Sequence, residues 1–378
     1  MNRFDHETIR TEMEQAVRAG VFPGGVLLAA RKGEILGVLT AGRLAYEGSS
    51  PAVTERTIYD LASLTKVLST TLLAMIFIDR GGLALGDRLE ELWDGPVPPD
   101  KKEITLARLL SHASGLPAWR PLYRRLRELP VRERRRAAAE AILAEPLVNA
   151  PGRQATYTDL GFILLGFILE RVSRVRQDEL FSLLIAQSLG LTRTRYRPLD
   201  HPPFWDDDLA PTEEGPRFSG PPGDPQGESL DSTPVGVVHD DNAAALSGVA
   251  GHAGLFGTAA EVWLIFQAMR SAYYRQPGPG LVTEETIQTF WRRSNEAPGS
   301  TWALGFDTPA EIGSSAGRLF SRHGLGHLGY TGTSLWHDLD RDLTVILLTN
   351  RVHPTAENWA IREFRPRLHD AVVKACSD

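Results

Sequence analysis

The sequence has little cysteine, no long apolar run and no excess of basic residues. Its 378 residues include one cysteine, Cys376, which excludes a disulfide framework and a cysteine-based zinc site. A membrane-spanning helix needs about 18 uninterrupted apolar residues, and no segment of the sequence approaches that length. The longest candidate, 68–78, is interrupted by polar residues. The 41 basic and 47 acidic residues give a net charge of −6, which argues against a general nucleic-acid binder.

Several further features are absent. Residues 1–17 are charged and lack the basic start and apolar core of a secretory signal peptide, so we expect a cytoplasmic protein with no membrane partner, unless a leader has been removed. The arginines of 120–136 alternate with Glu128 and Glu133, which favours a solvated helix surface over a nucleic-acid site. The histidines form no H-E-x-x-H pair, and we expect no metal and no cofactor.

The apolar pattern predicts strands at both ends of the chain and helices between them. A hairpin is expected at 24–39, helical patterns dominate 63–80 and 104–200, and strand-like runs return at 303–306, 333–337 and 343–349. We therefore predict an α+β fold, with one antiparallel sheet built from both chain ends and a mostly helical insertion. The expected division is 1–62 with 245–378 for the sheet domain and 63–244 for the insertion, which includes an irregular loop at 196–236.

The strongest local motif is Ser63-x-x-Lys66 at the start of a predicted helix. A spacing of three residues places the serine hydroxyl and the lysine amine on one helix face. A lysine desolvated there can lose its proton near neutral pH and act as a base toward the hydroxyl. Chance is the alternative, although the chain has only five lysines and about 0.3 such pairs are expected at random.

Two other segments carry candidate residues. Tyr157 and Asp159 stand at a loop-to-helix junction, where the phenol can relay a proton. The alternatives are a packing aromatic for Tyr157 and a helix N-cap for Asp159. His327 and Gly329 belong to a glycine-rich strand entry at 326–334, which allows close approach of a substrate, although a lone histidine there is more often a surface residue.

In this order, the three motifs resemble the serine β-lactamase and penicillin-binding-protein family, above all class C β-lactamases, family VIII-type esterases and D-aminopeptidase-like hydrolases. The resemblance extends over roughly residues 10–375. Further matching stretches are 109–116 (LLSHASGL), 157–162, 248–256 and 344–350. The segments 239–242 and 251–254 are expected, by resemblance, to border the cleft.

The resemblance implies a role for each motif residue. Ser63 would be the acylated nucleophile, Lys66 its base and Tyr157 the proton donor to the leaving group. The backbone N–H groups of Ser63 and Tyr330 would form the oxyanion hole.

Two departures from the family pattern bear on the substrate. His327-Leu328-Gly329 replaces the family's Lys-Thr-Gly, so a permanent cation for a substrate carboxylate is missing. Asp159 replaces an asparagine and, when ionised, can only accept hydrogen bonds, so it would hold Lys66 or a substrate cation. We therefore expect a serine hydrolase acting on a small ester or amide. A β-lactamase, a D-alanyl-D-alanine carboxypeptidase or D-aminopeptidase, and a non-catalytic binding module are the alternatives, and the oligomeric state stays open.

Overall fold

The main element of the fold is a five-stranded antiparallel sheet. The computed structural model describes residues 4–200, 208–214 and 235–376. The strand order is β2-β1-β8-β7-β6, so the first two strands along the chain pair directly with the last three. The strands are β1 (Gly24–Arg31), β2 (Glu34–Gly42), β6 (Gly324–Leu328), β7 (Ser334–Asp338) and β8 (Leu343–Thr349). The predicted α+β class, with a sheet built from both chain ends, is confirmed.

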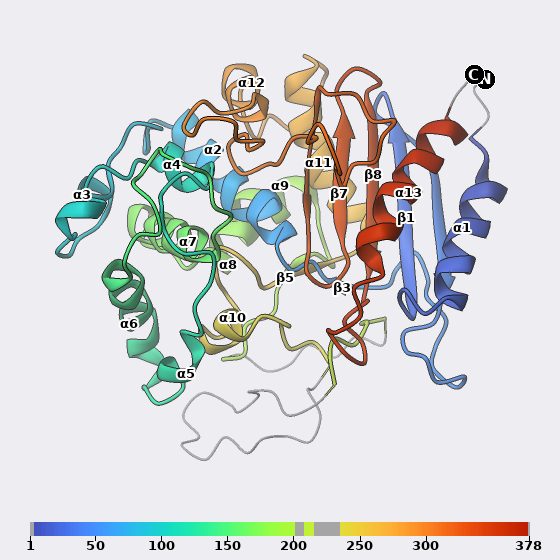
Figure 1. Cartoon of the computed structure of the whole chain (residues 1–378), viewed down its shortest axis with the longest axis horizontal. Helices are drawn as coiled ribbons and strands as arrows, with labels where there is room; N and C mark the ends of the chain where they lie inside the picture. The colour runs from blue at the N-terminus through green and yellow to red at the C-terminus, as the bar shows by residue number, and fades with distance from the viewer. Residues whose placement is uncertain (1–3, 201–207, 215–234, 377–378) are drawn as a thin grey trace.

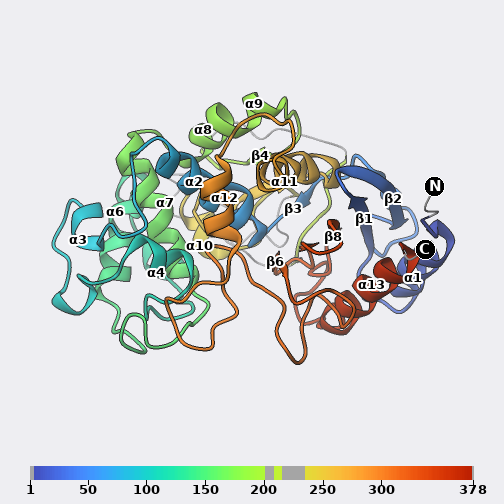
Figure 2. The same cartoon turned by 90° about the horizontal axis from the view of Figure 1, so that it is seen from above.

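Helices cover both faces of this sheet (Figures 1 and 2). On β1, Val26 and Leu28 belong to one apolar core, whereas Leu27 and Ala29 belong to the other, because successive side chains point to opposite faces. The first core includes α11 (Ala259–Tyr273), and the second includes α1 (His6–Arg18) and α13 (Ile361–Ala375). All five strands therefore bury at least part of their apolar surface, which makes the sheet a rigid support for groups at its edge.

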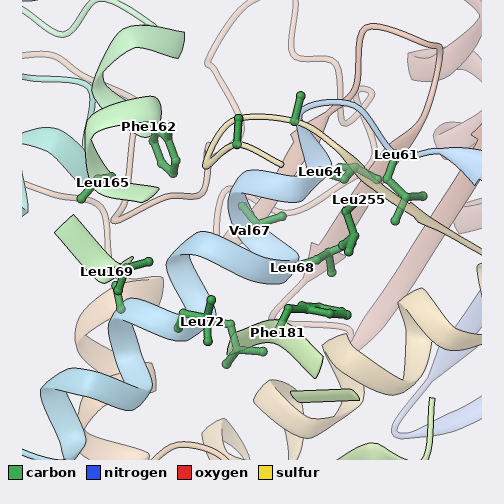
Figure 3. Packing of buried hydrophobic residues seen from close by; sticks show 14 of the residues in the cluster. Leu61, Leu64, Val67, Leu68, Leu72, Phe162, Leu165, Leu169, Phe181 and Leu255 are labelled. Carbon is green, nitrogen blue, oxygen red and sulfur yellow. The ribbon is translucent and has the colours of Figure 1, made fainter. Parts of the chain in front are cut away.

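A buried helix crosses the other half of the molecule. It begins as the π-helical turn η1 (Lys66–Thr71) and continues as α2 (Leu72–Asp79), and all its residues up to Ile76 are buried. Figure 3 shows its leucine and valine side chains packed against the helix α7 (Asp159–Ser173) and against Phe181. Because this helix is buried on all sides, it carries no amphipathic pattern, and its few polar side chains are buried with the apolar ones.

The remaining elements are short or surround this helix. They are β3 (Tyr59–Asp60), α3 (Leu89–Leu92), η2 (Pro99–Lys101), α4 (Leu106–Leu110), α5 (Tyr123–Leu126), α6 (Val131–Ala144), α8 (Gln177–Phe181), η3 (Ser182–Ala186), α9 (Gln187–Leu189), β4 (Arg195–Tyr196), α10 (Asp241–Ala245), β5 (Leu255–Gly257) and α12 (Glu284–Trp291). Within the described ranges, no helix is both long enough and apolar enough to cross a membrane. The division of the chain into a sheet domain and an insertion stays a prediction.

Three sequence-based expectations need comment. The stretch 104–200 is not wholly helical, because β4 joins β3 and β5 in a second, three-stranded sheet. Residues 303–306 are not a strand, and the edge strand is instead β6. Gly305 has φ +85°, and a Cβ there would lie 2.2 Å from Thr71 Oγ1, so this apolar run is a buried turn. Of the loop 196–236, residues 201–207 and 215–234 lie outside the described residues.

Candidate active site

Ser63 follows a turn that is hydrogen-bonded on several sides. The Asp60 carboxylate accepts hydrogen bonds from the backbone N–H groups of Ala62 (2.8 Å) and His239 (2.7 Å). The carbonyl of Asp60 accepts one from Thr331 Oγ1 at 2.8 Å. Ala62 has φ +47°, a left-handed conformation that costs free energy for any residue with a side chain. These bonds hold the serine at a sharp bend directly before the buried helix.

Lys66 is fully buried and its ammonium group donates three hydrogen bonds. Its Nζ lies 2.9 Å from Ser63 Oγ, 2.7 Å from Asp159 Oδ1 and 3.1 Å from the carbonyl oxygen of His252. Burial by itself lowers the pKa of Lys66, but the charge of Asp159, with a smaller contribution from Tyr157, outweighs burial and raises it above the ordinary value. The expectation that burial frees Lys66 of its proton near neutral pH is therefore wrong for this resting site.

Tyr157 contacts the other side of the same serine. Its hydroxyl donates a hydrogen bond to Ser63 Oγ at 2.8 Å. The ring packs against His112 at 4.7 Å and Trp302 at 5.7 Å between centroids, and Lys66 Nζ lies 5.0 Å from its centroid. Burial, helped by the charge of Asp159, raises the pKa of Tyr157 to about 12 although Lys66 opposes this. The phenol is thus neutral, and the structure brings Ser63, Lys66 and Tyr157 together as the motifs predict.

Asp159 is not the N-cap of its helix. That position belongs to Thr158, whose Oγ1 accepts from the backbone N–H of Gly161 at 3.3 Å. The N-cap alternative for Asp159 is therefore wrong. Its side chain is 17% exposed and forms the ion pair with Lys66, which is one of the two roles expected for a carboxylate here.

His327 lies on β6 and its side chain is buried, so the surface alternative is wrong. Its Nδ1 lies 2.8 Å from the carbonyl oxygen of Leu328, which can only accept, so Nδ1 carries the proton and Nε2 is a bare acceptor. Nε2 has no hydrogen-bond partner among the described residues. Burial, together with the charge of Lys66, lowers the pKa of His327 to about 3, so the imidazole is neutral at physiological pH.

Gly329 and Tyr330 bring the end of β6 against the serine turn. A Cβ on Gly329 would lie 1.9 Å from Thr333 Oγ1 and 2.8 Å from the carbonyl oxygen of Leu61, so no side chain fits. The Gly329 N–H already donates to the carbonyl of Thr333 at 2.7 Å. Within the described part of the chain, nothing accepts a hydrogen bond from the N–H of Tyr330 or of Ser63. Both N–H groups are available to a ligand, as an oxyanion hole requires.

These residues line one pocket of about 890 Å³, a volume that suits a small organic substrate. Three aromatic side chains at its wall are exposed, namely Trp119, Tyr330 and Trp359. Besides Asp159, carboxylates come from Glu213, Asp240, Asp241 and Asp307. Of the sequence-predicted site residues, Lys66 alone is absent from the pocket wall, since its side chain is covered by the other members of the site.

The segments 239–242 and 251–254, expected by resemblance to border the cleft, do contribute to the pocket wall, but no role for their side chains or for other supporting groups was predicted from the sequence. His252 holds Lys66 through its carbonyl, and its Nε2 lies 2.8 Å from Asp240 Oδ1. Although burial raises it, the pKa of Asp240 lies below the ordinary value, because His252 and a backbone N–H of α10 contact the carboxylate. His112 accepts a hydrogen bond at Nδ1 from the N–H of Thr158 (3.1 Å), next to Tyr157. The family-like stretch 109–116 contains His112, whereas no sequence signal identified Trp302.

The comparisons with known proteins agree with this geometry. A family model described as Beta-lactamase matches residues 9–365. A protein of Escherichia coli strain K12 named "putative D-alanyl-D-alanine carboxypeptidase" is 32% identical over 320 residues, which are 80% of this chain and 71% of that protein.

Two solved structures share the fold. The structure titled "EstCE1, a hydrolase with promiscuous acyltransferase activity" superposes with a TM-score of 0.73 at 23% identity and covers 97% of each chain. An octameric penicillin-binding protein homologue from Pyrococcus abyssi gives a TM-score of 0.70 at 19% identity, covering 98% of this chain and 78% of the other. At these identities the likeness establishes the fold and leaves the substrate open.

Proposed function

The chain belongs to the β-lactamase family of serine hydrolases, and from this premise we propose that it cleaves small esters or amides that lack a carboxylate, through an acyl-enzyme on Ser63. One observation carries the proposal. Ser63 Oγ lies on the wall of the pocket, 2.9 Å from Lys66 Nζ and 2.8 Å from Tyr157 Oη. A hydroxyl with two proton-transfer groups in hydrogen-bond range is the arrangement that an activated nucleophile needs.

The site must lose one proton before Ser63 can attack. In the resting state Ser63 Oγ accepts hydrogen bonds from both Lys66 and Tyr157, so neither group is free to take the serine proton. Attack requires the form in which the coupled pair of Lys66 and Tyr157 has lost one proton. In that form Lys66 takes the proton of Ser63 as the Oγ–C bond forms, and Tyr157 protonates the leaving group.

Charge development on the substrate oxygen is the second requirement. The N–H groups of Ser63 and Tyr330 stabilise the oxyanion of the tetrahedral intermediate, because they come from segments held rigidly by Asp60 and Gly329. Water then attacks the acyl-enzyme, and the same groups act in reverse to release the acid and restore Ser63.

The charges at the pocket wall support an uncharged substrate. His327, which occupies the position of the family's cationic lysine, is neutral, and Leu328 beside it offers no hydroxyl. Arg351 and Arg365 also line the pocket, but their guanidinium groups donate to backbone carbonyls. A substrate carboxylate would therefore meet Asp159 and other carboxylates, and Arg362 is the remaining arginine of the described pocket wall that could compensate it.

A D-alanyl-D-alanine carboxypeptidase is the second candidate, and Arg362 is the observation that favours it. This arginine lines the pocket, is exposed and stacks on Trp359 with 4.1 Å between the guanidinium carbon and the ring centroid. A guanidinium in that place can bind a carboxylate in a bidentate manner. Release of D-alanine from a D-alanyl-D-alanine peptide would select this candidate, and rapid turnover of a chromogenic β-lactam would select a β-lactamase.

The first experiment compares wild type with Ser63→Ala, using p-nitrophenyl butyrate for turnover and a fluorophosphonate probe for labelling. We expect hydrolysis to fall by at least about 10⁴-fold and labelling to disappear, because the attacking atom is removed. Ser182→Ala, which changes an exposed serine of η3, should keep both activities.

The outcome that contradicts the proposal is labelling and turnover that survive in Ser63→Ala. A wild type inert toward esters, amides, D-alanyl peptides and β-lactams alike would instead indicate the non-catalytic binding module. A cytoplasmic location and the lack of nucleic-acid and membrane partners stay predictions.

A further inference from the structure

Three chain segments that are far apart in the sequence meet beside the pocket. Asn350 links two of them, because its Nδ2 donates to the carbonyl of Leu44 at 2.8 Å and to that of Pro211 at 3.0 Å. The backbone N–H of Glu214 donates to the carbonyl of Pro354 at 2.8 Å. The segments around residues 44, 211 and 354 are thus held in a defined arrangement by hydrogen bonds that do not involve the side chains discussed next.

A buried histidine at this junction has an unused acceptor. His353 is 4% exposed, and its Nδ1 lies 2.9 Å from the carbonyl oxygen of Thr212. A carbonyl only accepts, so Nδ1 carries a proton, and in the neutral imidazole Nε2 then presents a lone pair. Nε2 has no hydrogen-bond partner in the described structure and lies 3.8 Å from Glu214 Oε1, too far for a hydrogen bond. A buried polar atom left in this state costs free energy unless something binds it.

Two exposed carboxylates lie close to this histidine. The carboxylate oxygens of Glu47 and Glu214 and the ring nitrogen of His353 all lie within 4.8 Å of one another. Three acceptors so close together repel one another unless a cation lies between them. In the described ranges of the chain, this is the one group of three such side chains with metal-binding spacing.

We propose that Glu47, Glu214 and His353 bind a divalent transition metal, with Zn²⁺ the best match. Imidazole nitrogen with carboxylate oxygen suits zinc better than the all-oxygen sets that calcium and magnesium prefer. The bond from Nδ1 to the Thr212 carbonyl orients the ring as histidine ligands of metals usually are. Zinc bonds of about 2.0–2.2 Å place ligand atoms about 3.4 Å apart. The three ligand atoms now lie within 4.8 Å of one another, and rotation of the two exposed glutamate side chains would bring them to the shorter distance. Water completes the tetrahedron.

The metal would act on the substrate pocket through one neighbouring residue. Glu213 lines the pocket, where its Oε2 lies 3.1 Å from His239 Nε2 and its Oε1 accepts from the N–H of Ala356 at 3.0 Å. A cation on Glu214 would tie this segment to the loop of Glu47 and thereby hold one wall of the pocket. The site is independent of the catalytic proposal, since none of its ligands contacts Ser63, Lys66 or Tyr157 within the described residues. No metal was expected from the sequence because the three ligands come from distant segments of the chain.

The test is equilibrium dialysis of the EDTA-treated full chain against ZnCl₂, with metal content measured per chain. We expect one Zn²⁺ per wild-type chain and a dissociation constant at least about tenfold weaker for Glu47→Gln and for Glu214→Gln. Both substitutions change exposed side chains, so the fold should survive. Glu55→Gln, at an exposed glutamate outside the group, should bind as wild type does.

Thermal unfolding supplies a readout that does not depend on catalysis. Zn²⁺ should raise the Tm of wild type and of Glu55→Gln, and leave the Tm of the Glu47→Gln, Glu214→Gln double variant unchanged. A wild type that takes up no stoichiometric Zn²⁺ overturns the proposal. Equal binding by wild type and the double variant overturns it as well, because the metal then lies elsewhere.

Discussion

Two ionisable groups of the site are buried to nearly the same extent, but only one of them is charged. One lies behind the wall formed by the buried helix, and the other lies in the wall formed by β6. Lys66, behind the helical wall, is fully buried and keeps its proton, whereas His327, on the strand wall, is 3% exposed and neutral. Burial disfavours the charged form of both groups. Part of the difference lies in the ordinary pKa values, 10.5 for lysine and 6.5 for histidine. The rest lies in their partners, because Asp159 is 2.7 Å from Lys66, whereas His327 has a carbonyl at one nitrogen and, among the described residues, no hydrogen-bond partner at the other.

The comparison shows that depth alone does not decide which group carries charge at this site, because the ordinary pKa of the group and a neighbouring carboxylate also contribute. It also shows that the two walls are coupled, since the charge of Lys66 itself helps to lower the pKa of His327. A change in the helical wall should therefore alter both the rate and its pH dependence. A neutral replacement of His327 in the strand wall should leave both limbs of the pH–rate profile unchanged. The predictions below test this difference.

The largest effect is expected from Lys66→Met, which removes the cation and leaves Asp159 without its partner. Loss of the proton acceptor should lower kcat/KM for p-nitrophenyl butyrate by about 10³-fold or more, since general acid–base groups contribute about 10²–10⁴-fold. Steady-state rates at pH 8 measure this loss. Thermal unfolding of the variant checks that the fold survives an unpaired, partly buried carboxylate.

Lys66→Arg is the matched control for charge. It keeps the cation beside Asp159 but cannot give up a proton in the accessible pH range. We expect it to be as inactive as Lys66→Met while binding an uncharged ketone analogue of the ester normally. Substantial turnover by Lys66→Arg would mean that the positive charge, and not the proton transfer, is what Lys66 supplies.

An intermediate effect is expected from Asp159→Asn. The carboxylate raises the pKa of Lys66 against burial, so its removal leaves burial and lowers that pKa. Lys66 then loses its proton at lower pH, and the acidic limb of the kcat/KM profile should move to lower pH by about one unit, which is about tenfold in rate on that limb. A profile from pH 5 to 10 measures the shift. An unchanged limb would show that another group sets it.

The sequence predicted contacts where they depend on local spacing and missed them where they depend on the tertiary fold. Ser63 and Lys66 are three residues apart on one helix, so their contact follows from helix geometry. The contact of Tyr157 with Ser63 spans 94 residues, and only the resemblance to a known family pointed to it. Trp302 packs on Tyr157 directly before a buried turn whose apolar run was interpreted as a strand.

The protonation state of Lys66 failed to follow from the sequence for the same reason. Burial was correctly expected, but the compensating charge of Asp159 comes from 93 residues further along the chain. The sheet shows the same limit. The long strands at 24–42 and 343–349 were predicted from apolar runs and a tight turn, whereas β4, with two residues, is too short to give a pattern.

The smallest effect is expected from His327→Gln, which replaces one neutral side chain of the strand wall with another. Because the pKa of His327 is about 3, the imidazole stays neutral throughout pH 5–9 and contributes no ionisation to the rate profile in that range. Both limbs of the kcat/KM profile should therefore stay within about 0.3 unit of wild type, a difference of about 0.4 kcal/mol at most. Asp159→Asn, measured in the same buffers, shows that the assay resolves a real shift. If His327→Gln instead removed a limb with a midpoint between pH 6 and 7, the strand wall would carry charge in the working enzyme, and a substrate carboxylate would have a partner there after all.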